Sequence, residues 1–172
     1  MKALKFLIKY VDLGLPSGTL WAENNLPNKH NVMEVLDELH DFVPTVTEFQ
    51  ELLECCKWEW NKKKTGYNVI GPNGNSIFLP AEGKDCLGYN NTWICDNGPD
   101  QYHSEFRVGY YWTSSHFKDE RKSVHLHWFE FNQNYQTHDC AYKEIDNIHR
   151  HQLENERMSI RIVKRIPIYE LR

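Results

Sequence analysis

The sequence predicts one domain of the α+β class. Its 172 residues suit a single domain, and its contents of 40% hydrophobic and 26% charged residues are ordinary for a globular protein. Two helical patterns lie in the first third of the chain, and short strand patterns separated by turns and long loops follow them. Because the helices are grouped rather than alternating with strands, an α+β layout is favoured.

The chain is predicted to open with two strands. Alternating apolar residues indicate a strand at about residues 4–12, and Pro16, Ser17 and Gly18 indicate the turn that follows it. A second strand is expected at residues 19–22. Residues 23–31 are expected to form a loop, because asparagine, proline and charged residues dominate them.

Two helices are predicted next. Apolar residues recur at helical spacing between Val32 and Leu39, and Asn31 is the expected N-cap. The second helix, at about residues 46–56, opens with a capping-box pattern in which Thr45 accepts from the Glu48 amide and the Glu48 side chain reaches back. Its predicted apolar face consists of Phe49, Leu52, Leu53 and Cys56.

Hairpins are predicted after the second helix. Trp58 and Trp60 alternate as in a strand and are expected to be mostly buried, and residues 61–66 form a hairpin tip. Residues 67–80 read as two short strands around the turn formed by residues 71–74. Residues 81–106 are rich in glycine, asparagine and aspartate and predict a long loop region.

The remaining strands are predicted at residues 110–114, 123–132 and about 158–165. Trp112 is expected in the core, whereas either Trp128 or Phe129 competes for the inward face of its strand. In the last strand, Ile160 and Ile162 are expected on one face, to which Lys164 also points by alternation. Arg161, Val163 and Arg165 are expected on the other face. Residues 133–157 are polar and are interpreted as an insertion before this strand.

Charge and hydropathy argue against two classes of partner. The net charge is −4 with a pI near 6.1, and the basic clusters at residues 62–64 and 161–165 are too short for a nucleic-acid-binding face. No stretch approaches the ~20 apolar residues of a membrane helix. The apolar run at residues 3–8 is interrupted by lysine, unlike a signal peptide. We therefore expect no nucleic-acid partner, no membrane insertion and synthesis in the cytoplasm without export.

The cysteines are expected to be free, partly buried thiols. They number five, an odd count, and form no CxxC motif. Cys55 and Cys56 are adjacent on a predicted helix and cannot easily pair with each other. A bridge between Cys86 and Cys95 is the alternative interpretation.

Six blocks of sequence occur in an order that resembles a known family. They are YVDLGLPSGTLWA from residue 10, VPTVTEFQELLECCKWEW from residue 43, GYNVIGPNGNSIFLPAEG from residue 66, GYYWTSS from residue 109, HLHWFEF from residue 125 and SIRIVKR from residue 159. In these blocks the chain is similar to the Fibrobacter succinogenes major paralogous domain family, which is common in Bacteroidetes. The resemblance covers about residues 10–165.

The resemblance implies a C-type lectin-like fold for residues 1–172. In that fold two helices flank a small twisted antiparallel sheet, the first and last strands pair, and long loops carry the ligand contacts. It also implies a non-enzymatic binding or adhesion module that recognises a protein or glycan through its loop face. The formylglycine-generating enzymes share the fold and use a paired-cysteine site, so an oxidoreductase of that type is the alternative.

Two departures from the family pattern bear on location and specificity. The family is generally taken as extracellular or cell-surface, whereas this sequence shows no export signal. We therefore expect a phage virion-associated protein, for decoration or host attachment, in preference to a cell-surface protein. The polar insertion at residues 133–157 is where this chain is expected to differ in specificity. The oligomeric state and the identity of the ligand are not predicted.

A serine hydrolase site is not favoured. Ser114, Ser115 and His116 lie beside one another near Asp119, but neighbouring side chains point apart in an extended strand. The sequence also has no G-x-S-x-G motif. Structural hydrogen bonds at the end of a strand explain these residues better.

Metal sites are weakly indicated. His125 and His127 share one face of a strand and, with His116 or His138, offer nitrogen ligands for zinc. No second pair is fixed by spacing, so solvent-facing histidines are the favoured interpretation. The Glu-Pro-Asn and Trp-Asn-Asp motifs of calcium-dependent sugar binding are missing. We expect no cofactor, and a structural ion stays open.

The binding face is expected in residues 85–106 and in the polar insertion. Aromatic rings lie there among asparagine, glutamine, histidine and serine, a composition typical of adaptable recognition surfaces. The alternative is that these rings cover a small core. The candidate ligand-binding residues are Tyr89, Trp93, Tyr102, His116, His125, His127, Tyr135 and His138.

Overall fold

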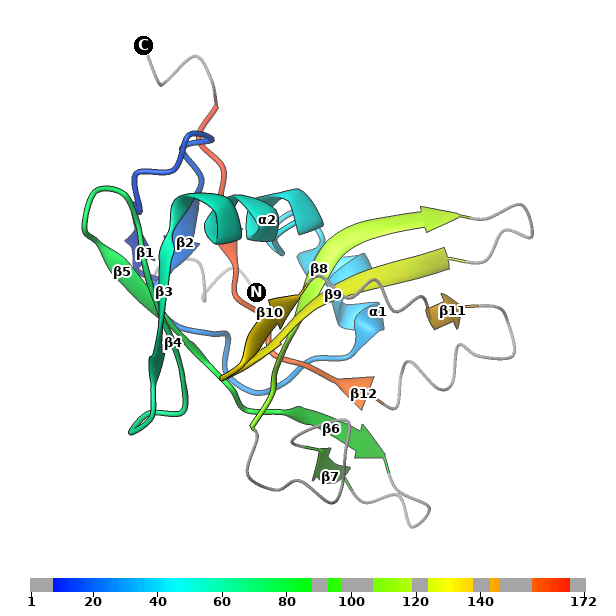
Figure 1. Ribbon diagram of the computed structural model, residues 1–172. Helices are drawn as coiled ribbons and strands as arrows, with labels where there is room; N and C mark the ends of the chain where they lie inside the picture. Colours follow the sequence, from blue (N-terminus) through cyan, green and yellow to red (C-terminus); the bar gives the residue numbers. More distant parts are fainter. Residues whose placement is uncertain are drawn as a thin grey trace.

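The computed structural model describes residues 8–87, 93–96, 107–118, 124–137, 143–145 and 156–167. In this part of the chain, a few short helices combine with small antiparallel sheets in a mixed α+β architecture (Figure 1). The prediction of the α+β class with small antiparallel sheets is therefore confirmed. Within the same residues, no helix is long and apolar enough to cross a membrane.

The first helical segment begins where its capping residue predicted. α1 (Val32–Glu34) continues directly into a π-helical turn, η2 (Val35–Leu39). The Asn31 side-chain oxygen accepts from the Glu34 amide at 3.0 Å, and the Glu34 carboxylate accepts from the Asn31 amide at 2.8 Å. Asn31 is thus confirmed as N-cap, and Glu34 completes a capping box around it.

The second helix, α2 (Val46–Cys55), carries the predicted capping box. The Thr45 amide donates to the Glu48 carboxylate at 2.8 Å, and the Glu48 amide donates to the Thr45 hydroxyl at 3.2 Å. Phe49 and Leu52 are fully buried on its apolar face. The other two residues of the predicted face, Leu53 and Cys56, are half-buried at its edge.

A small sheet joins the two ends of the described chain. β1 (Tyr10–Val11) pairs with β2 (Leu20–Ala22), and β2 pairs with β13 (Val163–Lys164), both antiparallel. Of the strand predicted at residues 4–12, residues 10 and 11 form β1, and residues 1–7 lie outside the described part. The last predicted strand is shorter than expected, because residues 158 and 159 form only isolated bridges.

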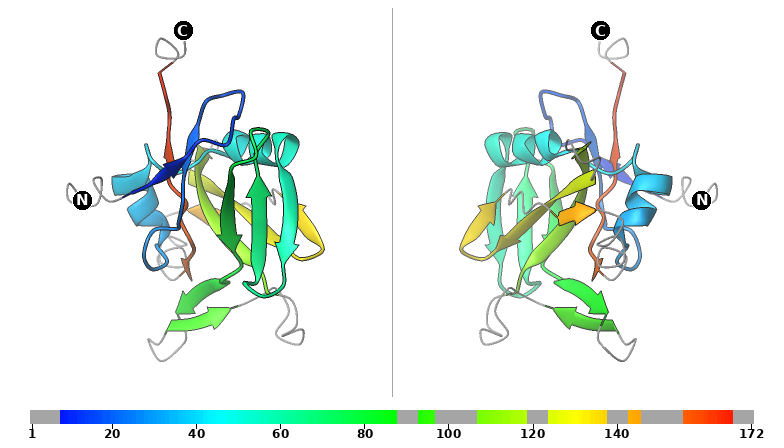
Figure 2. Two further views of the ribbon diagram at one scale, coloured as in Figure 1. Left: turned by 90° about the vertical axis from the view of Figure 1, so that its left-hand side faces the viewer. Right: turned by 90° about the vertical axis from the view of Figure 1, so that its right-hand side faces the viewer.

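The hairpins predicted after α2 are confirmed as a three-stranded antiparallel meander. It consists of β3 (Lys57–Asn61), β4 (Gly66–Ile70) and β5 (Ser76–Pro80), in that order across the sheet. Gly74 closes the second turn with a φ of +87°, a conformation that glycine adopts without steric cost. Figure 2 shows this meander face-on, with α2 at one end of its strands.

The two tryptophans of β3 are half-buried, so the prediction that they are mostly buried is only partly right. β3 is the edge strand of the meander, and its alternate residues Lys57 and Glu59 are exposed. Trp58 packs against the core and donates its indole N–H to the Leu52 carbonyl at 3.0 Å. The edge position leaves part of each ring, including that of Trp60, in contact with solvent.

A long hairpin forms the centre of the molecule. β8 (Gly109–Lys118) pairs antiparallel with β9 (Val124–Asn132), and β10 (Tyr135–Thr137) and β11 (Lys143–Ile145) pair with the other edge of β9 near its two ends. β8 is longer than predicted, so residues 116 and 117 belong to the strand and do not follow it. A register shift between residues 112 and 116 interrupts the pairing.

The Thr-Ser-Ser run of β8 ties this bulge to the start of α2. The Ser114 hydroxyl donates to the Val43 carbonyl at 3.0 Å, and the Ser115 hydroxyl accepts from the Val46 amide at 2.9 Å. The Thr113 hydroxyl donates to a carbonyl of β9 at 2.7 Å. These bonds confirm structural hydrogen bonding as the role of the run.

Residues 81–106 are not all loop, contrary to the prediction. β6 (Lys84–Leu87) pairs with β7 (Trp93–Asp96) and with β12 (Glu156–Arg157), which comes from the predicted polar insertion. The local sequence is poor in strand formers, and pairing with a distant segment decides the outcome. The β6–β7 hairpin projects beyond the end of the meander that lies away from α2 (Figure 2).

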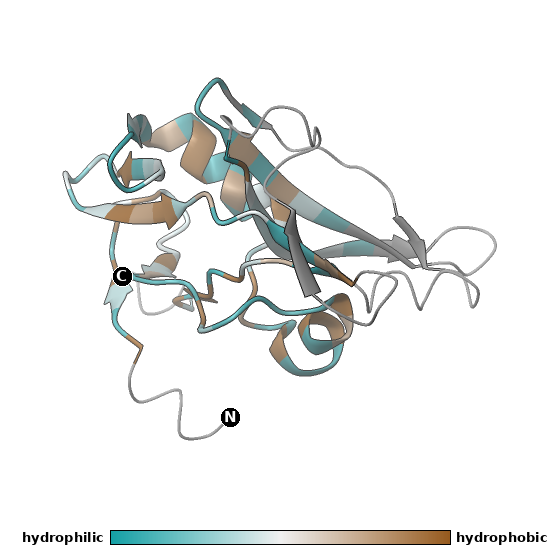
Figure 3. Ribbon diagram, turned by 90° about the horizontal axis from the view of Figure 1, so that it is seen from below, coloured by the Kyte–Doolittle hydropathy of each residue, from teal (hydrophilic) through white to brown (hydrophobic). Residues whose placement is uncertain are grey.

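The core has two apolar clusters, which take alternate residues of β8 and β9. Tyr111 and Phe129 pack in one cluster with Phe49 of α2, whereas Trp112 and Trp128 belong to the other, which includes η2. Both faces of the hairpin are therefore buried. Trp112 is 0% exposed, as predicted, and both candidates for the inward position of β9 are buried. Figure 3 shows brown, apolar bands on the helices and along the central strands, interleaved with teal ones.

Candidate functional site

A polar cleft of about 830 Å³ lies where several distant segments meet. Its walls are residues 24–29, the end of β5 with the residues that follow it, and Asp85 of β6. Three arginines complete the described lining: Arg107, Arg157 and Arg161. We call this hollow the polar cleft.

The buried Arg161 links the segments that form the wall of the polar cleft through its hydrogen bonds. The Arg161 guanidinium donates to the Asn25 side-chain oxygen at 2.8 Å and to the Ala22 and Glu23 carbonyls at 3.0 and 2.6 Å. It also donates to the carbonyl of Phe78 in β5. Arg161 was predicted only to lie on the face opposite the isoleucines. These four acceptors hold it inside the protein, where the residue is 1% exposed.

Burial has opposite effects on two pKa values in this wall. It lowers the pKa of Arg161, because desolvation disfavours the guanidinium charge, and it raises the pKa of Tyr111 to about 12. The neutral Tyr111 hydroxyl accepts from the Asn25 amide at 3.1 Å and donates to the Pro80 carbonyl at 2.9 Å. Residues 24–29, β5 and β8 are therefore joined by one hydrogen-bonded network.

The charges of the polar cleft are mainly positive. Its described lining carries four basic and two acidic side chains, although the whole chain has a net charge of −4. Lys29 and Asp85 form an ion pair at 2.8 Å. Arg107 is exposed and makes no hydrogen bond or ion pair with the described residues. A free guanidinium in a cleft is suited to bind an anion.

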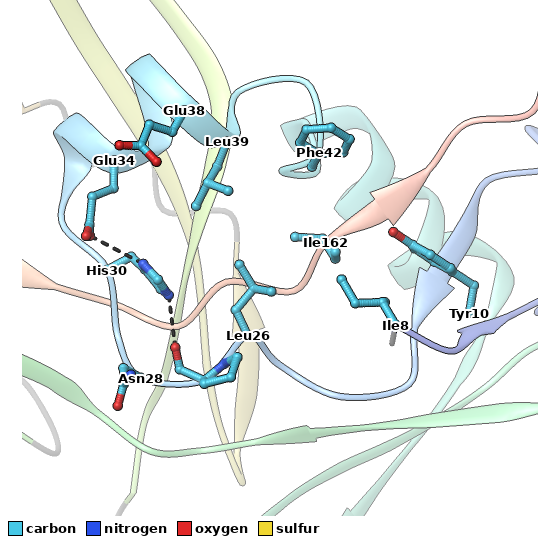
Figure 4. A pocket seen from close by; sticks show the side chains of 11 residues that line it. Ile8, Tyr10, Leu26, Asn28, His30, Glu34, Glu38, Leu39, Phe42 and Ile162 are labelled. Atoms are coloured by element: carbon cyan, nitrogen blue, oxygen red, sulfur yellow. Dashed lines mark hydrogen bonds and ion pairs between the residues drawn. The ribbon is translucent and has the colours of Figure 1, made fainter. Parts of the chain in front are cut away.

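A second, apolar pocket of about 310 Å³ shares residues 26–28 with the polar cleft as part of its lining (Figure 4). Its lining includes Ile8, Leu39, Phe42 and Ile162, with Tyr10 at one end. Burial raises the pKa of the Tyr10 hydroxyl. We call this hollow the apolar pocket.

Two polar residues of the apolar pocket, His30 and Glu34, are paired with each other. Figure 4 shows His30 directed toward Glu34, with 3.3 Å between Nδ1 of the ring and the carboxylate. The other ring nitrogen lies 3.0 Å from the Pro27 carbonyl oxygen. The same carboxylate accepts from Asn31 in the capping box. These groups fix the first helix and its entry loop.

Of the predicted site residues, only His116 and His127 have described side chains, and neither lines the polar cleft or the apolar pocket. His116 is exposed in β8, with its ring 5.3 Å from that of His40 and its Nδ1 3.0 Å from the Ser114 carbonyl oxygen. His127 is half-buried in β9, so the prediction that it faces solvent is only partly right. The bulge of β8 opposite His127 and the buried residues beside it account for this.

The other candidates are described only in part or not at all. Trp93, His125 and Tyr135 lie in β7, β9 and β10, and only the backbone is described at these three positions. Tyr89, Tyr102 and His138 lie outside the described residues.

Neither a metal centre nor a reactive thiol pair emerges from the described residues. No three histidine, cysteine or acidic side chains gather there in a way that would hold a metal ion. Cys55 and Cys56 are free thiols, as expected. Burial raises the pKa of Cys56 to about 11, and the neighbouring Cys55 and Glu51 add to the shift. A protonated thiol is a poor nucleophile and a poor metal ligand.

Sequence reasoning missed the polar cleft because its parts are far apart in the chain. Two local signals point toward it in retrospect. One is the concentration of asparagines in residues 24–28, and the other is Arg161 within the apolar run of residues 160–163. No protein-family model, curated protein or solved structure matches this chain.

Proposed function

We propose that this chain is a non-enzymatic binding module of the C-type lectin-like type, which recognises a protein or glycan at the polar cleft. The position of the cleft is the observation that carries the proposal. Asp85 and Arg107 flank residues 88–106, and Arg157 ends the predicted insertion. The cleft therefore lies at the base of both segments whose composition is typical of a recognition surface.

The arrangement of the sheets supports the lectin-like part of the proposal. The first and last described strands meet at β2, two helical segments precede the strands of the central hairpin, and the connections are long. These features agree with what the resemblance to the Fibrobacter succinogenes major paralogous domain family implies. Fold alone does not fix function, so the proposal rests on the cleft.

The thiol chemistry favours a binder over the alternative, an oxidoreductase of the formylglycine-generating type. Such an enzyme requires reactive cysteines, whereas the pKa of Cys56 is raised to about 11. Changing Cys55 and Cys56 to alanine should leave ligand capture intact. Loss of capture on these changes alone would support the enzyme.

A glycan array combined with a host-surface pull-down tests the proposal. Asn24 is an exposed wall residue, so Asn24→Trp should fill part of the polar cleft and abolish capture of any ligand that enters it. Lys63→Trp, at the exposed tip of the β3–β4 hairpin, is the matched control. Capture that survives Asn24→Trp, or no capture by the wild-type chain, would overturn the proposal.

The proposal includes the expected context of a phage virion-associated decoration or host-attachment protein. Mass spectrometry of purified virions from the source culture tests it. The chain should copurify with the particles in a fixed ratio, and its absence from them would remove this part of the proposal.

A further inference from the structure

We propose that the ligand of the polar cleft is an acidic saccharide, whose carboxylate pairs with Arg107 and whose hydroxyls bind the amides of Asn24 and Asn28. This inference rests on the proposed function, because it names the class of ligand that the same cleft takes. The argument uses the charge of the cleft, the free polar groups on its wall and the rigidity of that wall.

The first step is the excess of positive charge. The described lining has two more basic than acidic side chains, in a chain whose overall charge is negative. A cleft lined mainly by one sign of charge concentrates ligands of the opposite sign. Lys29 and Asp85 form an ion pair, so their charges offset each other. The excess positive charge of the cleft therefore comes from its arginines.

The second step separates the arginines by their roles. Arg161 donates four hydrogen bonds to protein oxygens. It therefore adds positive potential to the cleft, but its donors stabilise the wall and are not available to a ligand. Arg107 is exposed and makes no such bond among the described residues, so its planar guanidinium is available. Arginine binds carboxylates through two parallel N–H donors, with greater geometric specificity than lysine. Arg107 is therefore the expected partner of a ligand carboxylate.

The third step concerns the neutral groups. Asn24 and Asn28 are exposed on the wall, and neither side chain is hydrogen-bonded within the described chain. A carboxamide offers two N–H donors and one acceptor oxygen, which matches a hydroxyl that both donates and accepts. A saccharide presents several hydroxyls beside its carboxylate, whereas an extended acidic peptide presents mainly further carboxylates. The amides thus favour an acidic saccharide over an acidic peptide.

The last step is that the wall is fixed before a ligand arrives. The Leu26 and His30 amides donate to carbonyls of residues 160 and 158, both at 2.9 Å, and Asn25 is bonded to Arg161. Asn28 holds a left-handed backbone with a φ of +64°, which asparagine tolerates better than most residues. A rigid wall loses little conformational entropy on binding.

Isothermal titration with matched probes tests the inference. The probes are an oligogalacturonate and sialyllactose, each beside its methyl ester, and a tetraglutamate peptide. The ester keeps the size and hydroxyls of the acid but removes its charge. We expect at least one acid to bind about tenfold or more tightly than its ester, because a hydrogen bond to a charged group is worth about 1.5–3 kcal/mol. Arg107→Ser should remove this preference, and Lys63→Ser should keep it.

The outcomes separate this inference from the proposed function. If Asn24→Trp abolishes binding but each ester binds as tightly as its acid, the cleft is a ligand site and the acidic class is wrong. If Arg107→Ser leaves the preference unchanged, the role of Arg107 is wrong. Tighter binding of tetraglutamate than of either acidic saccharide also overturns the inference. If Asn24→Trp leaves the affinity unchanged, the proposed function itself is overturned.

Discussion

Arg161→Met is expected to destabilise the fold strongly. The arginine is 1% exposed, and its four hydrogen bonds join residues 22–25 to the end of β5. Methionine has a similar length but no donor. Three backbone carbonyls and the Asn25 side-chain oxygen therefore lose these donors inside the protein.

The magnitude follows from these four acceptors. Each buried acceptor that loses its partner costs about 1–3 kcal/mol. The costs do not add fully, because neighbouring groups relax and because removing a buried charge relieves its desolvation. We expect the free energy of unfolding to fall by about 3–5 kcal/mol, at the lower end of the sum of the four costs. That is a large part of the about 5–15 kcal/mol that stabilises a domain.

Urea unfolding followed by tryptophan fluorescence measures this loss. Arg165→Met is the matched control, because Arg165 also donates four hydrogen bonds, to Glu48, Asp41 and Val43, but its side chain is 40% exposed. We expect the control to cost about 1 kcal/mol, as a surface network does. If Arg161→Met costs no more than Arg165→Met, burial of the arginine is not what makes its bonds important.

Three further predictions address the helix cap, the central hairpin and the thiols. Thr45→Ala should cost about 1 kcal/mol in urea unfolding through loss of the α2 cap; an equal loss in the exposed control Thr47→Ala would contradict this. Gly109→Ala should cost about 1–3 kcal/mol, because a Cβ there meets the Phe131 ring; an unchanged melting temperature would count against it. In a variant whose other four cysteines are serine, Cys56 should react slowly with iodoacetamide at pH 8 and faster as pH rises, because burial, the main cause of its raised pKa, remains; equal rates in folded and unfolded chain would exclude the shift.

Local sequence signals predicted the parts of the fold that depend on neighbouring residues. The Asn31 and Thr45 caps and the turn at residues 71–74 each depend on groups within a few positions, and all three are present. Burial of Trp112 followed from its place in an apolar strand. In each case the stabilising partner is close in the chain, so that periodicity and capping chemistry suffice.

Features that depend on distant partners were missed or misplaced. β6 pairs with residues about 70 positions later, which no local pattern indicates. The burial of Arg161 was not predicted, because the backbone carbonyls that receive its hydrogen bonds come from two other segments of the chain. The polar cleft requires that same convergence. The side chains of the aromatic residues proposed for binding lie outside the description, and their role stays a prediction.

The most direct test of the polar cleft as the ligand site is amide chemical-shift mapping of the isotope-labelled chain with the tightest-binding acidic saccharide. Our account predicts that the largest shifts fall on residues 24–29, on Asp85 and on Arg107. It also predicts that these shifts disappear in Asn24→Trp. Shifts that gather instead around Ile8 and Phe42, in the apolar pocket, would contradict the account.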